Sequence, residues 1–347
     1  MDKMIDLWTY LARTNKKILL YGTGNGADKI LDELTKREIS VDGVFASDGF
    51  VRNRVFRGFQ VLSYTTACEK FGDFISLVCF GSSLAPVMDN IKKIASEGEL
   101  YAPDVPVVDN DSIFDTEYVR EHKEELFTAY NLLADDFSKK VFENVVLYKL
   151  TGKLDYLFQI ETPKIDTYEM LGVNDSEVYA DLGAYTGDTV KEFLEYANDY
   201  KGVIAAEPDV KNYKKLVLNT ENLKNISCFN VCISKDNGKI PFAMNSGRNS
   251  LAGKGETLVD AINIDTLLQN TGVSFIKMDI EGQEKNALLG GQKILSEQMP
   301  KLNIAAYHRN EDLFEIPILL NKINPNYKIY MRHHPYIPAW DTNFYAL

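Results

Sequence analysis

The chain has 347 residues, of which 45% are hydrophobic and 25% are charged, a composition typical of a soluble globular protein with about two domains. Its formal net charge of −12 disfavours a polyanionic partner, so we expect no binding to nucleic acid. No apolar run reaches the roughly 18 residues that span a bilayer, and the N-terminus lacks a secretory signal, so we expect a cytoplasmic protein without membrane contact.

The N-terminal part has the pattern of a nucleotide-binding α/β unit. An apolar strand at 17–21 leads into a glycine-rich turn and a helix at 27–36, and a second strand at 41–46 ends near an acidic residue. Further strands are predicted at 75–80 and 105–108. A glycine turn, a helix and an acidic residue some twenty positions later are the elements of a dinucleotide-binding unit. We therefore predict a second nucleotide site formed by Gly22, Gly24, Gly26 and Asp48.

This part is similar to the nucleotide-sugar-binding Rossmann domains of the PglD type, with Asp48 and the run Gly58-Phe59-Gln60-Val61 matching their region after the second strand. The resemblance implies a Rossmann-like domain over residues 1–115 that binds a nucleotide or a nucleotide-sugar. The alternative is that the glycines only permit a tight strand-to-helix turn in a domain that binds nothing.

Residues 116–163 read as a helical connector. Charged residues alternate with apolar residues at spacings of three and four, and the first proline after this stretch begins is Pro163. Leu126, Tyr130, Leu133 and Phe137 define an apolar face that we expect to be packed rather than to contact a ligand.

The C-terminal part contains a series of strands, each followed by a residue that could bind a ligand or act in catalysis. A strand from Val178 leads into a turn with Gly183 and Gly187 and then a helix at 190–196, and a second strand ends at Glu207. A third strand precedes Asp279 and Glu281, and a fourth, at 302–307, leads to His308. A further short strand is predicted at 263–265. Ligands bind beyond the carboxyl ends of strands in such sheets, so one cleft is expected to collect these side chains. The acid at the end of the second strand is placed to hold two ribose hydroxyls.

Five ordered motifs carry a family resemblance: Asp181–Thr189, Glu207-Pro208, Asn230–Ser234, Ile264–Leu267 and Ile276–Glu284. Together they resemble the FkbM family of S-adenosylmethionine-dependent methyltransferases. The resemblance implies a class I methyltransferase domain over residues 164–347, with a mostly parallel sheet and antiparallel edge strands. It implies S-adenosyl-L-methionine as cofactor, bound by Asp181, Gly183, Ala184, Tyr185, Gly187, Asp188, Thr189, Glu207, Pro208, Cys232 and Asp279.

The resemblance also implies O-methylation of a hydroxyl on a sugar, a nucleotide-sugar or a glycosylated metabolite. Such a transfer requires that the acceptor oxygen be positioned and that its proton be removed. We expect His308 to be the base, supported by Asp279 or Glu281, and the reverse assignment stays open.

A divalent ion held by these carboxylates is an alternative, but we predict no metal, since the four cysteines form no Cys-x-x-Cys pair and no ligand geometry is fixed. An anionic acceptor is expected to contact Arg309, Arg332 and His333, although a solvated pair on an edge strand is the plainer interpretation of His333 and His334. The glycine-rich segment 245–256 is a candidate for a loop that closes over the site, and a plain connector is the alternative.

Two other functions stay open. An NAD(P)-dependent sugar oxidoreductase or epimerase could use the turn from Gly22 to Gly26, although no Tyr-x-x-x-Lys motif accompanies it. A catalytically silent nucleotide-sugar-binding protein is the second. The expected partner is a small-molecule or glycan acceptor, and a homodimer is compatible with the sequence.

Overall fold

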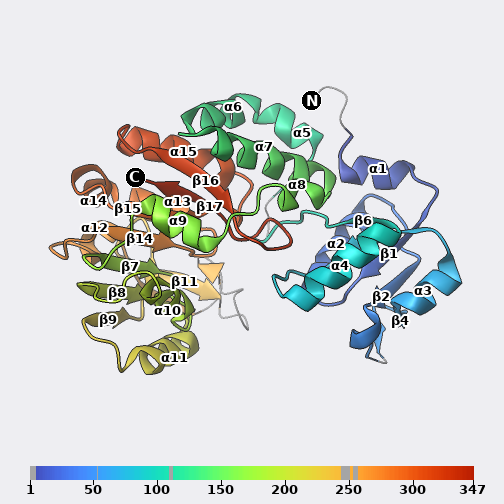
Figure 1. Ribbon diagram of the computed structural model, residues 1–347, viewed down its shortest axis with the longest axis horizontal. Helices are drawn as coiled ribbons and strands as arrows, with labels where there is room; N and C mark the ends of the chain where they lie inside the picture. The colour runs from blue at the N-terminus through green and yellow to red at the C-terminus, as the bar shows by residue number, and fades with distance from the viewer. Residues whose placement is uncertain (1–4, 53, 109–111, 244–250, 253–256) are drawn as a thin grey trace.

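The computed structural model of the chain describes residues 5–52, 54–108, 112–243, 251–252 and 257–347. Figure 1 shows an N-terminal sheet with its helices, in blue and cyan, beside a larger C-terminal sheet with its own helices. Both sheets are mostly parallel and both are covered by helices, which confirms the predicted α/β class with Rossmann-like architecture. No helix among these residues is long and apolar enough to cross a membrane.

The N-terminal sheet has the strand order β3-β4-β2-β1-β5-β6, and β3 is antiparallel to its neighbour. Its strands are β1 (Lys17–Tyr21), β2 (Gly43–Ala46), β3 (Val55–Phe56), β4 (Phe59–Ser63), β5 (Phe74–Val78) and β6 (Glu99–Tyr101). Its helices are α1 (Leu7–Arg13), α2 (Asn25–Lys36), η1 (Asp48–Phe50), α3 (Tyr64–Phe71) and α4 (Ala85–Glu97).

Alternate side chains of each strand enter different layers of the core, as the twofold period of a strand requires. On β1, Ile18 and Leu20 pack with α1 and α2, whereas Leu19 and Tyr21 pack with α3 and α4. The strand predicted at 105–108 does not form, and that prediction was wrong. The segment is an irregular connection that runs along the C-terminal unit.

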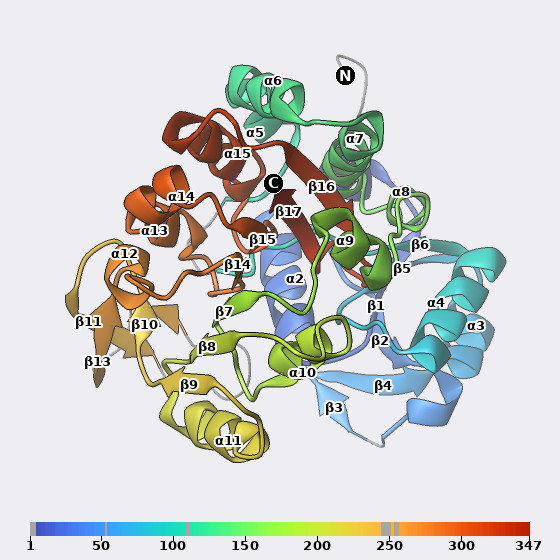
Figure 2. The same ribbon diagram turned by 60° about the vertical axis from the view of Figure 1, so that its left-hand side comes forward.

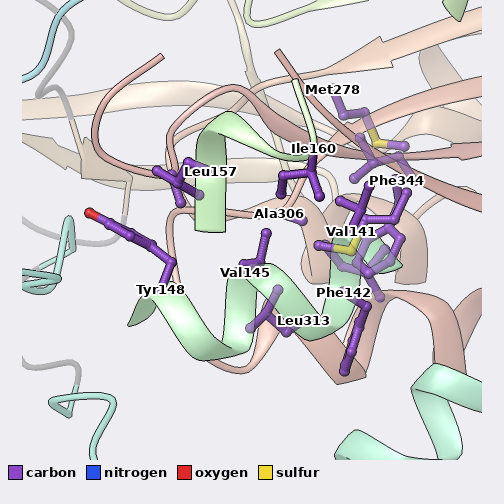
Figure 3. Packing of buried hydrophobic residues seen from close by; sticks show 14 of the residues in the cluster. Val141, Phe142, Val145, Tyr148, Leu157, Ile160, Met278, Ala306, Leu313 and Phe344 are labelled. Atoms are coloured by element: carbon purple, nitrogen blue, oxygen red, sulfur yellow. The ribbon is translucent and has the colours of Figure 1, made fainter. Parts of the chain in front are cut away.

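Helices then connect the two sheets: α5 (Thr116–Glu121), α6 (Lys123–Leu132), α7 (Asp136–Thr151) and α8 (Asp155–Phe158). Asp135 caps α7 by accepting a hydrogen bond from the backbone N–H of Ser138 at 2.6 Å. Figure 3 shows Val141 and Val145 of α7 beside Leu313 and Phe344, which belong to the C-terminal unit. The helices are therefore part of a continuous core rather than a free linker. The domain limits 1–115, 116–163 and 164–347 stay a prediction.

The C-terminal sheet has seven strands in the order β16-β17-β15-β14-β7-β8-β9, which Figure 2 shows from dark red to yellow. They are β7 (Val178–Leu182), β8 (Gly202–Ala206), β9 (Ile226–Phe229), β14 (Phe275–Met278), β15 (Lys301–Ala305), β16 (Ile329–His333) and β17 (Thr342–Ala346). Strand β17 is antiparallel to both of its neighbours, so the antiparallel strand lies inside the sheet and the edge strand β16 runs with the others.

Helices cover both faces of this sheet: α9 (Lys164–Leu171), α10 (Asp188–Leu194), α11 (Val210–Thr220), α12 (Ile264–Leu267), α13 (Glu284–Leu289), α14 (Gln292–Glu297) and α15 (Asp312–Ile323). The strand predicted at 263–265 was wrong. Asn263 instead accepts a hydrogen bond from the backbone N–H of Thr266 at 2.8 Å, which starts the short helix α12.

A small sheet lies beside the large one, in the order β10-β13-β11-β12. Its strands are β10 (Cys232–Ile233), β11 (Gly238–Ala243), β12 (Leu251–Ala252) and β13 (Thr257–Ile262). Apart from β12, most of the segment 245–256 that was expected to close over the site lies outside the described residues.

Candidate active site

The site lies where the order of the C-terminal sheet reverses. From the central strand β7 the chain proceeds to β8 and β9 on one side and later to β14 and β15 on the other, which opens a crevice at the carboxyl ends. A cavity of about 310 Å³ occupies this position. Its walls include the turn after β7, the ends of β8, β14 and β15, and the loop between β16 and β17.

The turn after β7 needs glycine for two physical reasons. Gly183 has φ of +88°, and a Cβ atom at this position would lie 2.0 Å from the backbone oxygen of Asp279. The turn can therefore pack directly on the end of β14. Its next residues bring Tyr185 to the cavity, where the backbone N–H of Tyr185 donates to Glu207 Oε2 at 3.0 Å.

Asp181 lies beneath this turn and is fully buried. Its Oδ2 accepts a hydrogen bond from the Thr189 hydroxyl, and its Oδ1 lies 3.3 Å from Lys277 Nζ. Burial raises the pKa of Asp181, against the opposing charge of Lys277. The carboxylate is not among the residues that line the cavity, whereas Thr189 and Lys277 are. The partners of Asp181 are thus Thr189 and Lys277, and a direct ligand contact by Asp181 stays a prediction.

Glu207 ends β8 and does line the cavity, although its side chain is almost completely shielded from bulk solvent. Its oxygens accept hydrogen bonds from the backbone N–H groups of Tyr185 at 3.0 Å and Asp209 at 2.9 Å. Burial is the main cause that raises the pKa of Glu207 to about 7, since the two N–H groups compensate only in part. Each carboxylate oxygen can accept a second hydrogen bond, so further donors are accommodated.

Most of the other residues expected to bind the cofactor are on the cavity wall: Gly183, Asp188, Thr189, Pro208, Cys232 and Asp279. Ala184 and Gly187 are not. Ala184 is fully buried, and Gly187, with φ of +86°, begins α10 and packs toward Leu216. Cys232 is buried, and burial raises the pKa of its thiol to about 12, so it contributes an uncharged surface.

The three residues expected to be catalytic come together at the ends of β14 and β15. His308 Nε2 lies 3.4 Å from Asp279 Oδ1 and 3.5 Å from Glu281 Oε2. The side chain of His308 is 1% exposed, whereas that of Asp279 is 36% exposed and also accepts a hydrogen bond from the Tyr307 hydroxyl at 3.1 Å.

Glu284 completes this cluster, and the sequence analysis did not single it out although it ends the last of the five motifs. It is fully buried, its Oε1 lies 3.1 Å from His308 Nδ1, and the same oxygen accepts a hydrogen bond from the backbone N–H of Ile280. Burial alone would lower the pKa of His308, but the carboxylates of Glu284, Glu281 and Asp279 outweigh it and raise that pKa to about 10. His308 is therefore an imidazolium at neutral pH.

One subset of these side chains has the chemistry of a cation site. Asp279, Glu284 and His308 place one ligand atom each within 4.8 Å of one another. Carboxylate oxygens and an imidazole nitrogen suit several divalent ions, so the arrangement could hold a metal in place of the imidazolium proton.

The residues expected to hold an anionic acceptor are directed elsewhere. Arg309 Nε donates to the backbone oxygen of Gly282 at 2.9 Å. Arg332 pairs with Asp135 at 2.7 Å and donates to Ser138 at 2.7 Å, so it fastens β16 to the start of α7. Neither arginine lines the cavity.

His333 and His334 are also buried rather than solvated, so that interpretation was wrong. His333 Nδ1 lies 2.9 Å from the Thr342 hydroxyl, and burial lowers the pKa of His333 to about 4. His334 bridges the backbone oxygen of Thr162 and the Tyr345 hydroxyl at 2.7 Å each. Helix α7 and the segment before α9 pack on β16, and neither histidine lines the cavity.

The glycine turn of the N-terminal unit has internal packing reasons for its composition. A Cβ atom on Gly26 would lie 2.3 Å from the backbone oxygen of Cys79, and one on Gly22 would lie 2.5 Å from the ring of Phe80. Gly24, with φ of +121°, precedes α2. The fourth expected residue, Asp48, accepts hydrogen bonds from the backbone N–H and the hydroxyl of Thr65 in the first turn of α3, whose N-cap is Ser63. A nucleotide site here stays a prediction.

Several residues on the cavity wall carried no functional signal in the sequence, among them Val107, Tyr336 and Trp340. Val107 comes from the irregular connection of the N-terminal unit, and Tyr336 and Trp340 come from the loop between β16 and β17. No motif or spacing distinguishes them, because they are brought to the cavity by tertiary packing.

Residues 181–327 match the methyltransferase FkbM domain. No curated protein matches the chain. The crystal structure of methyltransferase FkbM from Methylobacillus flagellatus KT is similar, with a TM-score of 0.74 and 23% identity, over 96% of this chain and 90% of that chain. This similarity extends over both units and shows a shared fold.

Two other solved structures match only part of the chain. Fibrillarin from Aeropyrum pernix, in complex with natively bound S-adenosyl-L-methionine, has a TM-score of 0.34 and 11% identity, over 53% of this chain and 74% of that chain. An rRNA methylase from Streptococcus thermophilus has a TM-score of 0.34 and 15% identity, over 54% of this chain and 96% of that chain.

Proposed function

Because residues 181–327 match the methyltransferase FkbM domain, we propose that the chain methylates a hydroxyl of a sugar, a nucleotide-sugar or a glycosylated metabolite, with S-adenosyl-L-methionine as donor. When bound, this cofactor supplies an electrophilic methyl group on a sulfonium. The protein therefore has to bind the cofactor, orient the acceptor and accept one proton.

The position of the Glu207 carboxylate is the observation that supports the proposed cofactor most strongly. Glu207 is a desolvated carboxylate on the wall of a cavity at the topological switch point, and its oxygens can accept further hydrogen bonds. Vicinal ribose hydroxyls are donors that would occupy this capacity and favour its charged form. The turn at Gly183 packs closely on the end of β14 and leaves the cavity open for a ligand. Lys277 and Thr189 also line this part of the cavity.

Asp279 is the base in this proposal. His308 is almost fully enclosed and charged at neutral pH, so both of its nitrogens carry a proton and neither can accept another. Asp279 is the more exposed partner and faces the cavity. We assign it the proton of the acceptor hydroxyl, released as the oxygen bonds to the methyl carbon. His308 and Glu284 then act as positioning residues that hold Asp279 and Glu281.

The domain match supports methyl transfer over an oxidoreductase, an epimerase or a silent nucleotide-sugar binder. We place the reaction in the cytoplasm. The four cysteines, Cys68, Cys79, Cys228 and Cys232, are free thiols, which is typical of a reducing compartment.

The test is methyl transfer itself. The purified chain is incubated with S-adenosyl-L-methionine carrying a trideuterated methyl group and a panel of methyl glycosides and nucleoside-diphosphate sugars, and products are measured by mass spectrometry. At least one sugar should gain the labelled methyl group. Asp279→Asn should reduce kcat about a hundredfold or more. Glu297→Gln, which changes an exposed carboxylate, is the matched control and should leave kcat unchanged.

Absence of labelled product with every acceptor would contradict the sugar assignment. Full activity of Asp279→Asn would contradict the choice of base.

A further inference from the structure

An aromatic pair forms one end of the cavity. Tyr336 and Trp340 lie in the loop between β16 and β17, with ring centroids 6.0 Å apart and ring planes inclined by 29°. Both are half-buried, and both line the cavity. Trp340 thus presents apolar area at one end of a cavity whose wall combines apolar, polar and charged side chains.

The strand order places this pair on the acceptor side. Glu207 follows β8, which lies on one side of the central strand β7. The loop with Tyr336 and Trp340 connects β16 and β17, on the opposite side, beyond β14 and β15. Asp279 and His308 end β14 and β15 and therefore lie between the cofactor end and the aromatic end.

Polar residues share the cavity wall with the aromatic pair. Lys164 Nζ lies 2.7 Å from Glu192 Oε2 and 3.7 Å from Asp341 Oδ2, and Asn343 Nδ2 donates to Asp341 Oδ1 at 3.1 Å. All four residues line the cavity. An apolar platform with donors and acceptors at its edge matches a molecule that has one apolar face and a rim of hydroxyls. A flat aromatic acceptor would offer fewer hydrogen-bonding groups to these polar residues.

The N-terminal unit supports this platform. Ser82, after β5, and Ile337 exchange two backbone hydrogen bonds, of 2.8 Å and 3.0 Å, and form an isolated bridge between the units. A Cβ atom on Gly81 would lie 2.7 Å from the Trp340 ring and 3.1 Å from the Tyr336 ring. Figure 1 shows the dark red connection between β16 and β17 reaching toward the N-terminal unit. The glycine allows the backbone to back the aromatic pair directly.

We propose that Tyr336 and Trp340 form the acceptor platform, on which the apolar face of a pyranose ring stacks while its hydroxyls contact the surrounding polar residues. The N-terminal unit holds this platform in place through Gly81 and Ser82. The inference rests on the proposed methyl transfer, since it describes the acceptor of that reaction. It gives the N-terminal unit a role in acceptor binding that does not depend on a nucleotide at its glycine turn.

The two tryptophans of the chain make a direct assay feasible. Trp8 is 2% exposed in the core of the N-terminal unit, so a Trp8→Phe variant has Trp340 as its fluorescent reporter. This variant is titrated with methyl α-D-glucopyranoside, methyl α-D-mannopyranoside, methyl α-L-rhamnopyranoside and UDP-glucose, and with catechol as an aromatic probe. Each titration is run with and without S-adenosylhomocysteine, whose own binding is measured by calorimetry.

At least one pyranoside should change the Trp340 emission in a saturable manner. Adding Tyr336→Ala should weaken that pyranoside about tenfold, because one aromatic contact is lost, and should leave S-adenosylhomocysteine affinity unchanged. The inference is overturned if no pyranoside alters the emission, or if catechol does so and the sugars do not. Failure of S-adenosylhomocysteine to bind would instead contradict the proposed cofactor. The titrations without it would still show whether a pyranoside binds at Tyr336 and Trp340.

A glycine pair tests the contribution of the N-terminal unit. Gly81→Ala should displace Trp340 and weaken the same pyranoside about fivefold, with S-adenosylhomocysteine affinity unchanged. Gly98→Ala is the matched control, because Gly98 lies in the same unit, has no positive φ and has open space around a Cβ atom. If Gly81→Ala and Gly98→Ala bind the pyranoside equally well, the N-terminal unit does not hold the platform.

Discussion

Titration of Glu207 gives the sharpest quantitative expectation for cofactor binding. The pKa of this buried carboxyl is raised to about 7, and ribose hydroxyls would donate to its charged form. Binding should therefore be strongest where Glu207 is ionised. About nine-tenths of the carboxyl groups are ionised at pH 8 and about one-tenth at pH 6, so affinity should fall about tenfold, or about 1.4 kcal/mol, between these values.

The assay is calorimetric titration of the chain with S-adenosylhomocysteine at pH 6, 7 and 8. Glu207→Gln keeps the size of the side chain and removes its titration, so this variant should bind about tenfold or more weakly at pH 8 and should show little change with pH. Glu221→Gln alters an exposed carboxylate at the end of α11 and should behave like the unaltered chain. If the affinity for S-adenosylhomocysteine changed equally with pH in the unaltered chain and in Glu207→Gln, the prediction would be wrong, because another group would then cause the change.

Three further expectations concern other parts of the site. The pKa of His308 is raised from 6.5 to about 10, so its contribution to stability is complete below pH 6.5 and is lost as the pH rises toward 10. The free energy of unfolding, measured with urea, should therefore fall between these pH values. His308→Gln should make this fall smaller. Arg332→Ala should lower the thermal midpoint, since the pair with Asp135 at the start of α7 is lost, but an altered S-adenosylhomocysteine affinity would contradict its assignment as a structural residue. Gly183→Ala should lower the free energy of unfolding by about 1–3 kcal/mol and reduce the affinity for S-adenosylhomocysteine at least tenfold, because the turn must leave its positive φ or move away from Asp279. Unchanged binding in calorimetry would argue against the close approach of the turn to β14.

The position of the site could be predicted from the sequence because parallel strands end at one edge of a sheet. Asp279, Glu281 and His308 each follow an apolar run, and the register of β14 with β15 brings them within 3.5 Å. The carboxylate that ends β8 reaches the same cavity by the same reasoning. These inferences needed only strand direction and the order of the motifs.

The surroundings of individual side chains could not be predicted, since they depend on residues far away in the chain. Arg332 and His333 lie on a strand whose pattern suggested an exposed edge, but α7 and the segment before α9 cover it. The partner of Arg332, Asp135, is almost two hundred positions earlier. No local period encodes such a contact.

The protonation state of His308 could not be predicted from the sequence either. His308 looked like a base because histidine titrates near neutral pH, but the fully buried Glu284 and two further carboxylates hold it in the charged form. The sequence shows that these acids are near one another along the chain, and the fold decides that all of them face the same imidazole. That arrangement is the reason for moving the role of the base to Asp279.

A crystal structure of the chain with S-adenosylhomocysteine tests the central claim most directly. The account expects the ligand in the cavity at the carboxyl ends of β7 and β8, with its ribose hydroxyls on Glu207 and its sulfur directed toward Asp279. Density at the turn from Gly22 to Gly26 instead, or a ribose that does not contact Glu207, would contradict it.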